Sequence, residues 1–160
     1  MSNQEKLHFK IGLSRSSTKK QPKFKIYVNN TELVCAELTS DAHTIEYFEF
    51  DAAVDEGDCH LAVEFLNKSV HDTVLDATGN IIEDLLLNIE SIEIDEIDLG
   101  FLLWTTSNYY PEYPKSHQIK MQDLGNTLPE SVKNCVNLGW NGKWMLSFTS
   151  PFYIWLLDNI

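Results

Sequence analysis

Apolar and polar residues alternate along much of the chain, and a period of two is typical of strands with one buried face. The alternation covers residues 7–13, 24–28, 59–65 and 143–149. The side chains that it assigns to a common interior are Leu7, Phe9, Ile11, Leu13, Phe24, Ile26, Val28, Cys59, Leu61, Val63, Phe65, Trp144, Leu146 and Phe148. Short strands separated by turns every eight to twelve residues or so predict an antiparallel β-sandwich.

Three dipeptides predict tight turns between strands. Asn29-Asn30 is expected to turn the chain into the following strand, because Asn tolerates positive φ. Asp95-Glu96 is expected to form a second hairpin turn. Asn141-Gly142 is the strongest turn signal and predicts a hairpin that joins residues 136–140 to residues 143–148.

The remaining segments have weaker periodicity. Residues 43–51 are expected to form a strand, residues 67–80 a polar loop, and residues 105–130, which are rich in Tyr, Pro, Ser and Asn, an irregular loop. Residues 81–90 allow a helix, since Leu and Glu favour one. Strand is preferred there because every second residue from position 85 to position 89 is apolar.

The last ten residues are too apolar for a free tail. We expect them to dock on the body, or to meet a partner subunit, through Phe152, Ile154, Trp155 and Leu157. The chain is therefore predicted to be one all-β domain over residues 1–160, an antiparallel β-sandwich of jelly-roll type. Residues 1–100 would form the sandwich body, and residues 101–160 an aromatic loop, a hairpin and the docked segment.

Charge is unevenly distributed. The net charge is −12, and residues 32–99 hold 19 acidic residues against one base, Lys68. This balance argues against duplex nucleic acid as the main partner, because phosphate contacts need a basic surface. The acidic stretch is open to two interpretations, a solvated face or a set of carboxylates around a divalent cation.

Several classes of protein find no support in the sequence. No apolar run reaches the length of a membrane span, which is roughly 18 residues, and the first residues lack the apolar stretch of a signal peptide. The three cysteines, Cys35, Cys59 and Cys135, form no C-x-x-C pair and are expected to be free thiols. Nucleophile-elbow, phosphate-loop, dinucleotide and zinc-protease motifs are absent, so we predict no catalytic activity.

Within residues 59–98, the strand Val63-Glu64-Phe65-Leu66-Asn67 is followed by a polar loop and by Asp84-Leu85-Leu86-Leu87-Asn88-Ile89-Glu90-Ser91-Ile92-Glu93-Ile94. This pattern resembles the calcium-dependent xylan-binding family of carbohydrate-binding modules. Leu86 replaces an Asn of the family pattern, and Glu90 replaces an Asp. The residues that match are Asn67, Asp84, Leu87, Ile89, Ile92 and Ile94. The resemblance implies a sandwich fold and a glycan ligand.

Calcium is the candidate cofactor. Asp72, Asp76, Asn80 and Asp84 are the candidate ligands, with backbone carbonyls of the same loop completing the set. The spacing is not that of an EF-hand. The alternative is a plain loop without metal, because the Gly and Asn after Asp76 also suit an ordinary turn.

Sugar binding requires aromatic faces that stack on pyranose rings. The candidate binding residues are Trp104, Tyr109, Tyr110 and Tyr113, which lie on a Pro-containing segment after an expected strand. The alternative is that these rings pack over the edge of the sandwich. Trp140 and Trp144 are instead expected in the core or at an interface.

The C-terminal part of the chain contains NLGWNG at 137–142 and SPFYIWLLDN at 150–159. Through these segments the whole chain also resembles small accessory proteins of tailed phages of marine cyanobacteria. It implies a location in the host cytoplasm or the virion. The predicted function is non-catalytic binding of a glycan or of another virion subunit, with oligomerisation through the apolar C-terminal segment. The alternative is a purely structural assembly protein without a sugar site.

Overall fold

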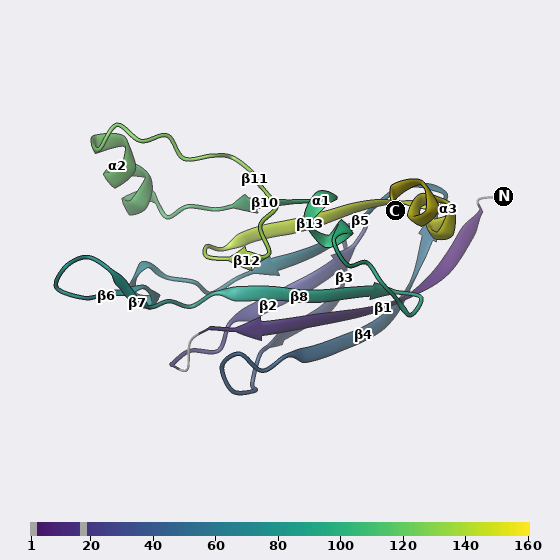
Figure 1. Ribbon diagram of the computed structural model, residues 1–160, viewed down its shortest axis with the longest axis horizontal. Helices are drawn as coiled ribbons and strands as arrows, with labels where there is room; N and C mark the ends of the chain where they lie inside the picture. Colours follow the sequence, from purple (N-terminus) through teal and green to yellow (C-terminus); the bar gives the residue numbers. More distant parts are fainter. Residues whose placement is uncertain (1–2, 17–18) are drawn as a thin grey trace.

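The computed structural model describes residues 3–16 and 19–160 and shows two antiparallel sheets packed face to face (Figure 1). The first sheet has the strand order β12-β8-β1-β4, with the short β9 paired to β8. Its strands are β1 (Gln4–Arg15), β4 (Glu46–Asp55), β8 (Leu87–Ile94), β9 (Ile97–Asp98) and β12 (Asn137–Leu138). The predicted β-sandwich is confirmed.

The second sheet has the order β11-β10-β13-β5-β2-β3. Its strands are β2 (Lys23–Val28), β3 (Thr31–Glu37), β5 (Gly57–Phe65), β10 (Ser107–Pro111), β11 (Val132–Lys133) and β13 (Gly142–Ser150). The late strand β13 pairs with β5 over nine residues and lies between β5 and β10. The C-terminal part of the chain therefore supplies a central strand of the sandwich.

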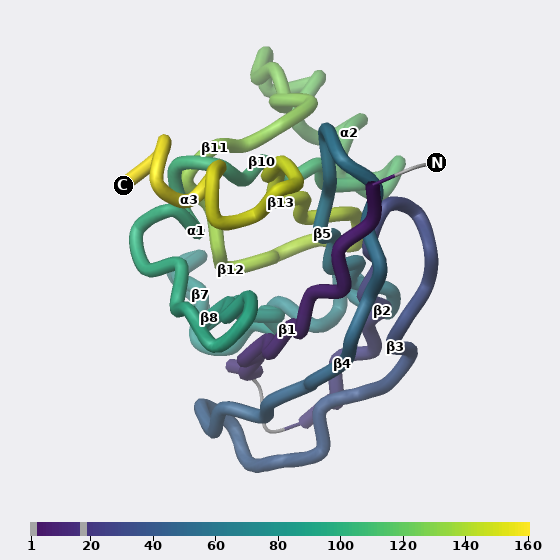
Figure 2. The backbone as a smooth tube through the Cα atoms, turned by 90° about the vertical axis from the view of Figure 1, so that its right-hand side faces the viewer, coloured from purple at the N-terminus to yellow at the C-terminus, as the bar shows by residue number. Residues whose placement is uncertain are grey.

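The core lies between the two sheets, and the end-on view in Figure 2 shows the layers that enclose it. Each of the 14 side chains that the alternation assigned to the interior is at most 3% exposed. The alternation works because successive side chains of a strand point to opposite faces of its sheet. Trp144 and Phe9 are among the largest fully buried side chains.

The segment 81–94 is extended, as the sequence favoured. It contains β7 (Ile81–Glu83) and β8, and its pairing with β1 shifts register between Gly12 and Leu13. In a regular strand, residues 89 and 92 would point to opposite faces, because side chains alternate with a period of two. The irregularity lets both Ile89 and Ile92 point inward.

The turns give a mixed outcome. Asn29 and Asn30 have φ values of 48° and 68°, and Asp95 and Glu96 of 52° and 67°, so both predicted hairpin turns are present. The hairpin predicted at Asn141-Gly142 is wrong. Residues 137–138 form β12, which pairs with β8 in the other sheet, so the chain crosses between the sheets before β13 begins.

Residues 105–130 and residues 43–51 differ from the structures expected for them. Residues 105–130 contain β10 and the helix α2 (Lys115–Asp123), which has no buried residue. A further short helix, α1 (Leu102–Thr105), precedes β10. The strand expected at 43–51 is β4, which begins three residues later, at Glu46. In the part of the chain that the structure describes, every helix is too short or too polar to cross a membrane.

The C-terminal segment docks on the body as a helix, α3 (Phe152–Asn159). Phe152 and Trp155 are buried against Phe148, with ring centroids 6.3 and 6.2 Å from it. Ile154 and Leu157 were expected to dock as well, but they are 59% and 70% exposed because they lie on the outer side of the helix.

Candidate functional site

Three segments that are far apart in sequence meet at one end of the sandwich, opposite α3 (Figure 1). They are the segment 67–84, the helix α2, and the loop 139–141 before β13. The segment 67–84 contains the short helix η1 (Val70–Asp72), β6 (Val74–Leu75) and β7. Together these segments line a groove with a volume of about 510 Å³, which we call the end groove.

The end groove combines apolar and polar groups. Val70, Leu75 and Ile81 give it an aliphatic side, and Trp140 supplies an aromatic ring. Its polar side chains are Thr73, Asp84, Ser116, His117 and Lys120. Lys120 is exposed, whereas Asp84, His117 and Trp140 are half-buried.

Trp140 is held in place by its neighbours. Its ring centroid lies 4.7 Å from that of His117 and 6.2 Å from that of Tyr113, the latter in an edge-on arrangement. Its backbone is fixed by Tyr109, whose hydroxyl donates to the Trp140 carbonyl and accepts from the Trp140 N–H at 2.9 Å. Burial raises the pKa of the Tyr109 hydroxyl, so this group stays protonated as a donor.

The loop that carries Trp140 is fastened to the segment 67–84. The Asn141 side chain accepts from the Lys68 N–H at 2.7 Å and donates to the Lys68 carbonyl at 3.0 Å. The Lys68 Nζ also lies 5.6 Å from the centre of the Trp140 ring, within cation–π distance. Lys68 therefore contacts both the backbone and the ring face of this loop.

Two lysine–aspartate pairs hold the segment 67–84 itself. The Lys68 ammonium, whose side chain is 1% exposed, donates to Asp84 Oδ1 at 2.5 Å and to the Leu85 carbonyl at 2.9 Å. The Lys20 ammonium donates to Asp72 Oδ2 at 2.9 Å. Burial alone would raise the pKa of the Asp72 carboxyl, but the hydrogen bonds from Lys20 and from the Ser69 N–H outweigh burial and lower that pKa.

The tip of the segment is an ordinary turn. Asp76 Oδ1 accepts from the Thr78 hydroxyl at 2.7 Å, from the Thr78 N–H at 2.8 Å and from the Asn80 N–H at 3.0 Å. These bonds, the one from the Thr78 hydroxyl first, lower the pKa of the Asp76 carboxyl. Asn80 donates its side-chain amide back to Thr78.

The four candidate calcium ligands do not form one ligand set. Asp72 and Asp84 each face a lysine, and Asp76 and Asn80 face their own turn. Within residues 3–16 and 19–160, no three His, Cys, Asp or Glu side chains converge as a metal ion would need. Calcium needs several oxygen ligands at about 2.3–2.6 Å, and this arrangement does not fit it.

The four candidate sugar-binding residues are also not brought together. Tyr109 is 3% exposed and serves the backbone of the Trp140 loop. Trp104 is 43% exposed on α1, and Tyr110 is 44% exposed on β10. Only Tyr113 belongs to the ring contacts around Trp140, and its hydroxyl donates to the Pro129 carbonyl at 2.9 Å.

Trp140, which was expected in the core or at an interface, supplies the half-buried aromatic ring of the end groove. The signal for it was present, because Trp140 stands between Gly139 and Asn141-Gly142, a context typical of loops. Leu86, which replaces a polar residue of the family pattern, lies against Gly139: a Cβ built on that glycine would be 3.5 Å from Leu86 Cδ2.

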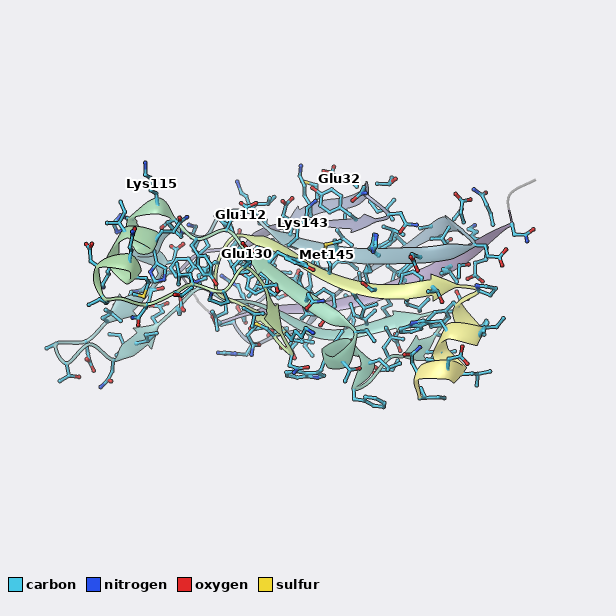
Figure 3. All side chains as sticks on the ribbon, turned by 90° about the horizontal axis from the view of Figure 1, so that it is seen from above. Glu32, Glu112, Lys115, Glu130, Lys143 and Met145 are labelled. Atoms are coloured by element: carbon cyan, nitrogen blue, oxygen red, sulfur yellow. The ribbon has the colours of Figure 1, made fainter. Side chains whose placement is uncertain are left out.

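A second and more polar hollow of about 590 Å³ lies on the other side of α2. Glu112 and Glu130 lie at its border near the end of β10, and Lys115 points outward from the helix (Figure 3). Gln118, Gln122 and Asn126 contribute side-chain amides to it. Tyr113 lines this hollow and contacts the end groove through Trp140.

Searches of protein-family models and of curated proteins find no match for this chain. Among solved structures, a vCBM60 in complex with galactobiose is 15% identical, covers 89% of this chain and 97% of its own, and has a TM-score of 0.49. A selenomethionine form of vCBM60 is 13% identical, covers 88% of this chain and 89% of its own, and has a TM-score of 0.51. The chain has the fold of a carbohydrate-binding module. The second structure is described in connection with a circular permutation that links two families of calcium-dependent carbohydrate-binding modules.

Proposed function

We propose that this protein is a non-catalytic glycan-binding module and that the end groove is its binding site. The observation that carries the proposal is Trp140, an aromatic ring fixed by backbone and ring contacts beside Asp84, His117 and Lys120. The fold similarity to carbohydrate-binding modules and the pattern at residues 59–98 support it.

The groove has the chemistry that a sugar ring needs. An indole face offers a flat apolar surface to the C–H groups of a pyranose, and charged groups near its edge can bind the hydroxyls. Among the described residues, both hydrogen bonds that Asp84 accepts from other side chains use Oδ1, so Oδ2 remains for a ligand. Lys120 and His117 on α2 offer donors on the other side.

The direct test is a glycan array followed by calorimetry with xylo- and galacto-oligosaccharides. Trp140→Ala should weaken binding at least about ten-fold, which corresponds to about 1.4 kcal/mol. Trp104→Ala is the matched control, since the Trp104 ring is 43% exposed but lies on α1, outside the groove. Equal affinity of both variants and the wild type would remove Trp140 from the site, and release of any cleaved product would contradict a non-catalytic role.

A second function, binding of another protein subunit, is favoured by one observation. Leu75 and Ile81, which line the end groove, are 52% and 61% exposed. Apolar side chains exposed together are typical of protein interaction sites. Under this alternative the protein is an assembly component of a phage virion, and either role would place it in the host cytoplasm or on the virion. Light scattering of the wild type and of Ile81→Asp would reveal self-association through these side chains.

A further inference from the structure

The acidic segment 67–84 meets cations that belong to the chain itself. Lys68 and Lys20 place their ammonium groups on Asp84 and Asp72, the two half-buried acids among the expected calcium ligands. We infer that Lys68 takes the neutralising role that a bound calcium ion would have, and that the end groove forms and binds its ligand without metal. The part of this inference that concerns a ligand rests on the proposed function.

The Lys68 ammonium group has partners on three sides. An ammonium group has three N–H donors. Two of them meet the oxygens of Asp84 and Leu85, and the face of the Trp140 ring lies on a further side. A charge that is 1% exposed persists only where such partners compensate for its lost hydration.

A calcium ion would compete with this lysine for the same carboxylate. Asp84 Oδ1 lies 2.5 Å from the Lys68 Nζ and also accepts from Thr73 at 2.8 Å. A calcium ion bound to that carboxylate would stand within a few ångströms of an ammonium group, and two cations at that distance repel strongly in a half-buried site. Metal binding at Asp84 therefore requires Lys68 to leave.

Lys68 also positions the ring of the binding site. It contacts Asn141 through its backbone and Trp140 through its ammonium group, so one residue links the acidic segment to the loop that presents the indole. Loss of its charge should change the environment of Trp140 even though residue 68 is absent from the lining of the groove.

The first experiment compares melting temperatures in chelator and in about 5 mM calcium at constant ionic strength. A ligand that binds only the native state raises the melting temperature, so an unchanged value, within about 1 °C, is expected for the wild type. A rise of several degrees would overturn the inference. This test needs no glycan, so it remains decisive if the glycan-binding proposal fails.

The second experiment removes the charge and keeps the apolar stem. Lys68→Met should lower the melting temperature, whereas Lys6→Met, which breaks an ion pair on a side chain that is 74% exposed, should have little effect. Adding Asp84→Asn to Lys68→Met should recover part of the loss, because no unpaired carboxylate remains. A double variant no more stable than Lys68→Met would show that pairing with Asp84 is not the role of Lys68.

The third experiment observes Trp140 directly. In protein labelled with 5-fluorotryptophan, the ¹⁹F resonance that disappears in Trp140→Phe reports on this ring. It should move in Lys68→Met and stay in place when calcium is added to the wild type. For any glycan found to bind, the Kd should agree within about two-fold in chelator and in calcium, and a ten-fold or so weaker Kd in chelator would overturn the inference.

Discussion

Two alanine substitutions in the C-terminal helix α3 should differ strongly in their effect on the free energy of unfolding. Phe152 is fully buried, and its ring centroid lies 6.3 Å from Phe148 and 5.9 Å from Trp155. Leu157, on the same helix, is 70% exposed. Phe152→Ala removes a large buried ring and should lower the free energy of unfolding by about 3–5 kcal/mol, whereas Leu157→Ala should change it by no more than about 0.5 kcal/mol.

Urea denaturation followed by far-UV circular dichroism measures this difference, since the signal does not depend on the nearby tryptophan. For a chain of this size, 1 kcal/mol corresponds to roughly 2–4 °C, so Phe152→Ala should melt about 6–20 °C lower. If Phe152→Ala does not fold, the smaller truncation Phe152→Leu should still be less stable than Leu157→Ala. Equal stability of the buried and the exposed variants would refute the docking of α3 through Phe152.

Three further predictions follow from single residues. The hydrogen bond to Asp51 raises the pKa of His8 above 6.5. The stabilisation of the fold by protonated His8 is therefore fully present below about pH 6.5 and is lost as the pH rises through the raised pKa. The melting temperature of His8→Gln should accordingly lie further below that of the wild type at about pH 5.5 than at about pH 8. Gly142→Ala should destabilise strongly, because Gly142 has a φ of 135° and its added Cβ would lie 2.2 Å from a backbone oxygen; Gly139→Ala, where the nearest atom is at 3.5 Å, should be tolerated, as thermal melts will show. Burial raises the pKa of the Cys59 thiol, so a thiol reagent should label it only as the chain unfolds.

The strands β1, β2, β5 and β13 could be predicted from the sequence because each of them buries one face. In β1, for example, Leu7, Phe9, Ile11 and Leu13 are all fully buried. The helix α2 could not be predicted in the same way. It has no buried residue, so no apolar periodicity marks it, and its residues contribute only helix propensity.

The site was harder to predict than the fold because its contacts join distant parts of the chain. Asn141-Gly142 carries the local signal of a hairpin, yet the Asn141 amide pairs with the backbone of Lys68, 73 residues away in sequence. Turn propensity indicates where the chain bends and does not indicate which strand follows. Since this misassignment placed residues 136–140 in a hairpin, it also hid the position of Trp140 in the lining of the end groove.

The partners of the acidic residues 32–99 were also missed because they lie far away in the sequence. Counted along the sequence, residues 32–99 hold one base, which left a solvated face or a metal ion as the two interpretations. Folding brings lysines from the N-terminal segment to these acids. The pairs are Lys6–Asp51, Lys10–Glu93, Lys19–Glu83, Lys20–Asp72 and Lys25–Glu32.

The exposed ion pairs differ in strength from the buried pair between Lys68 and Asp84. The Lys6 side chain is 74% exposed, and a pair of this kind contributes at most about 1 kcal/mol and weakens in salt. Lys68 is 1% exposed, and the loss of its charge would leave Asp84 without its cation beside Trp140. Ligand binding in the end groove can consequently be tested separately from calcium binding. Under the proposed function, the groove presents Trp140 to a glycan with Lys68 as its internal cation. Added salt should then weaken the surface pairs while it leaves the Lys68–Asp84 pair in place.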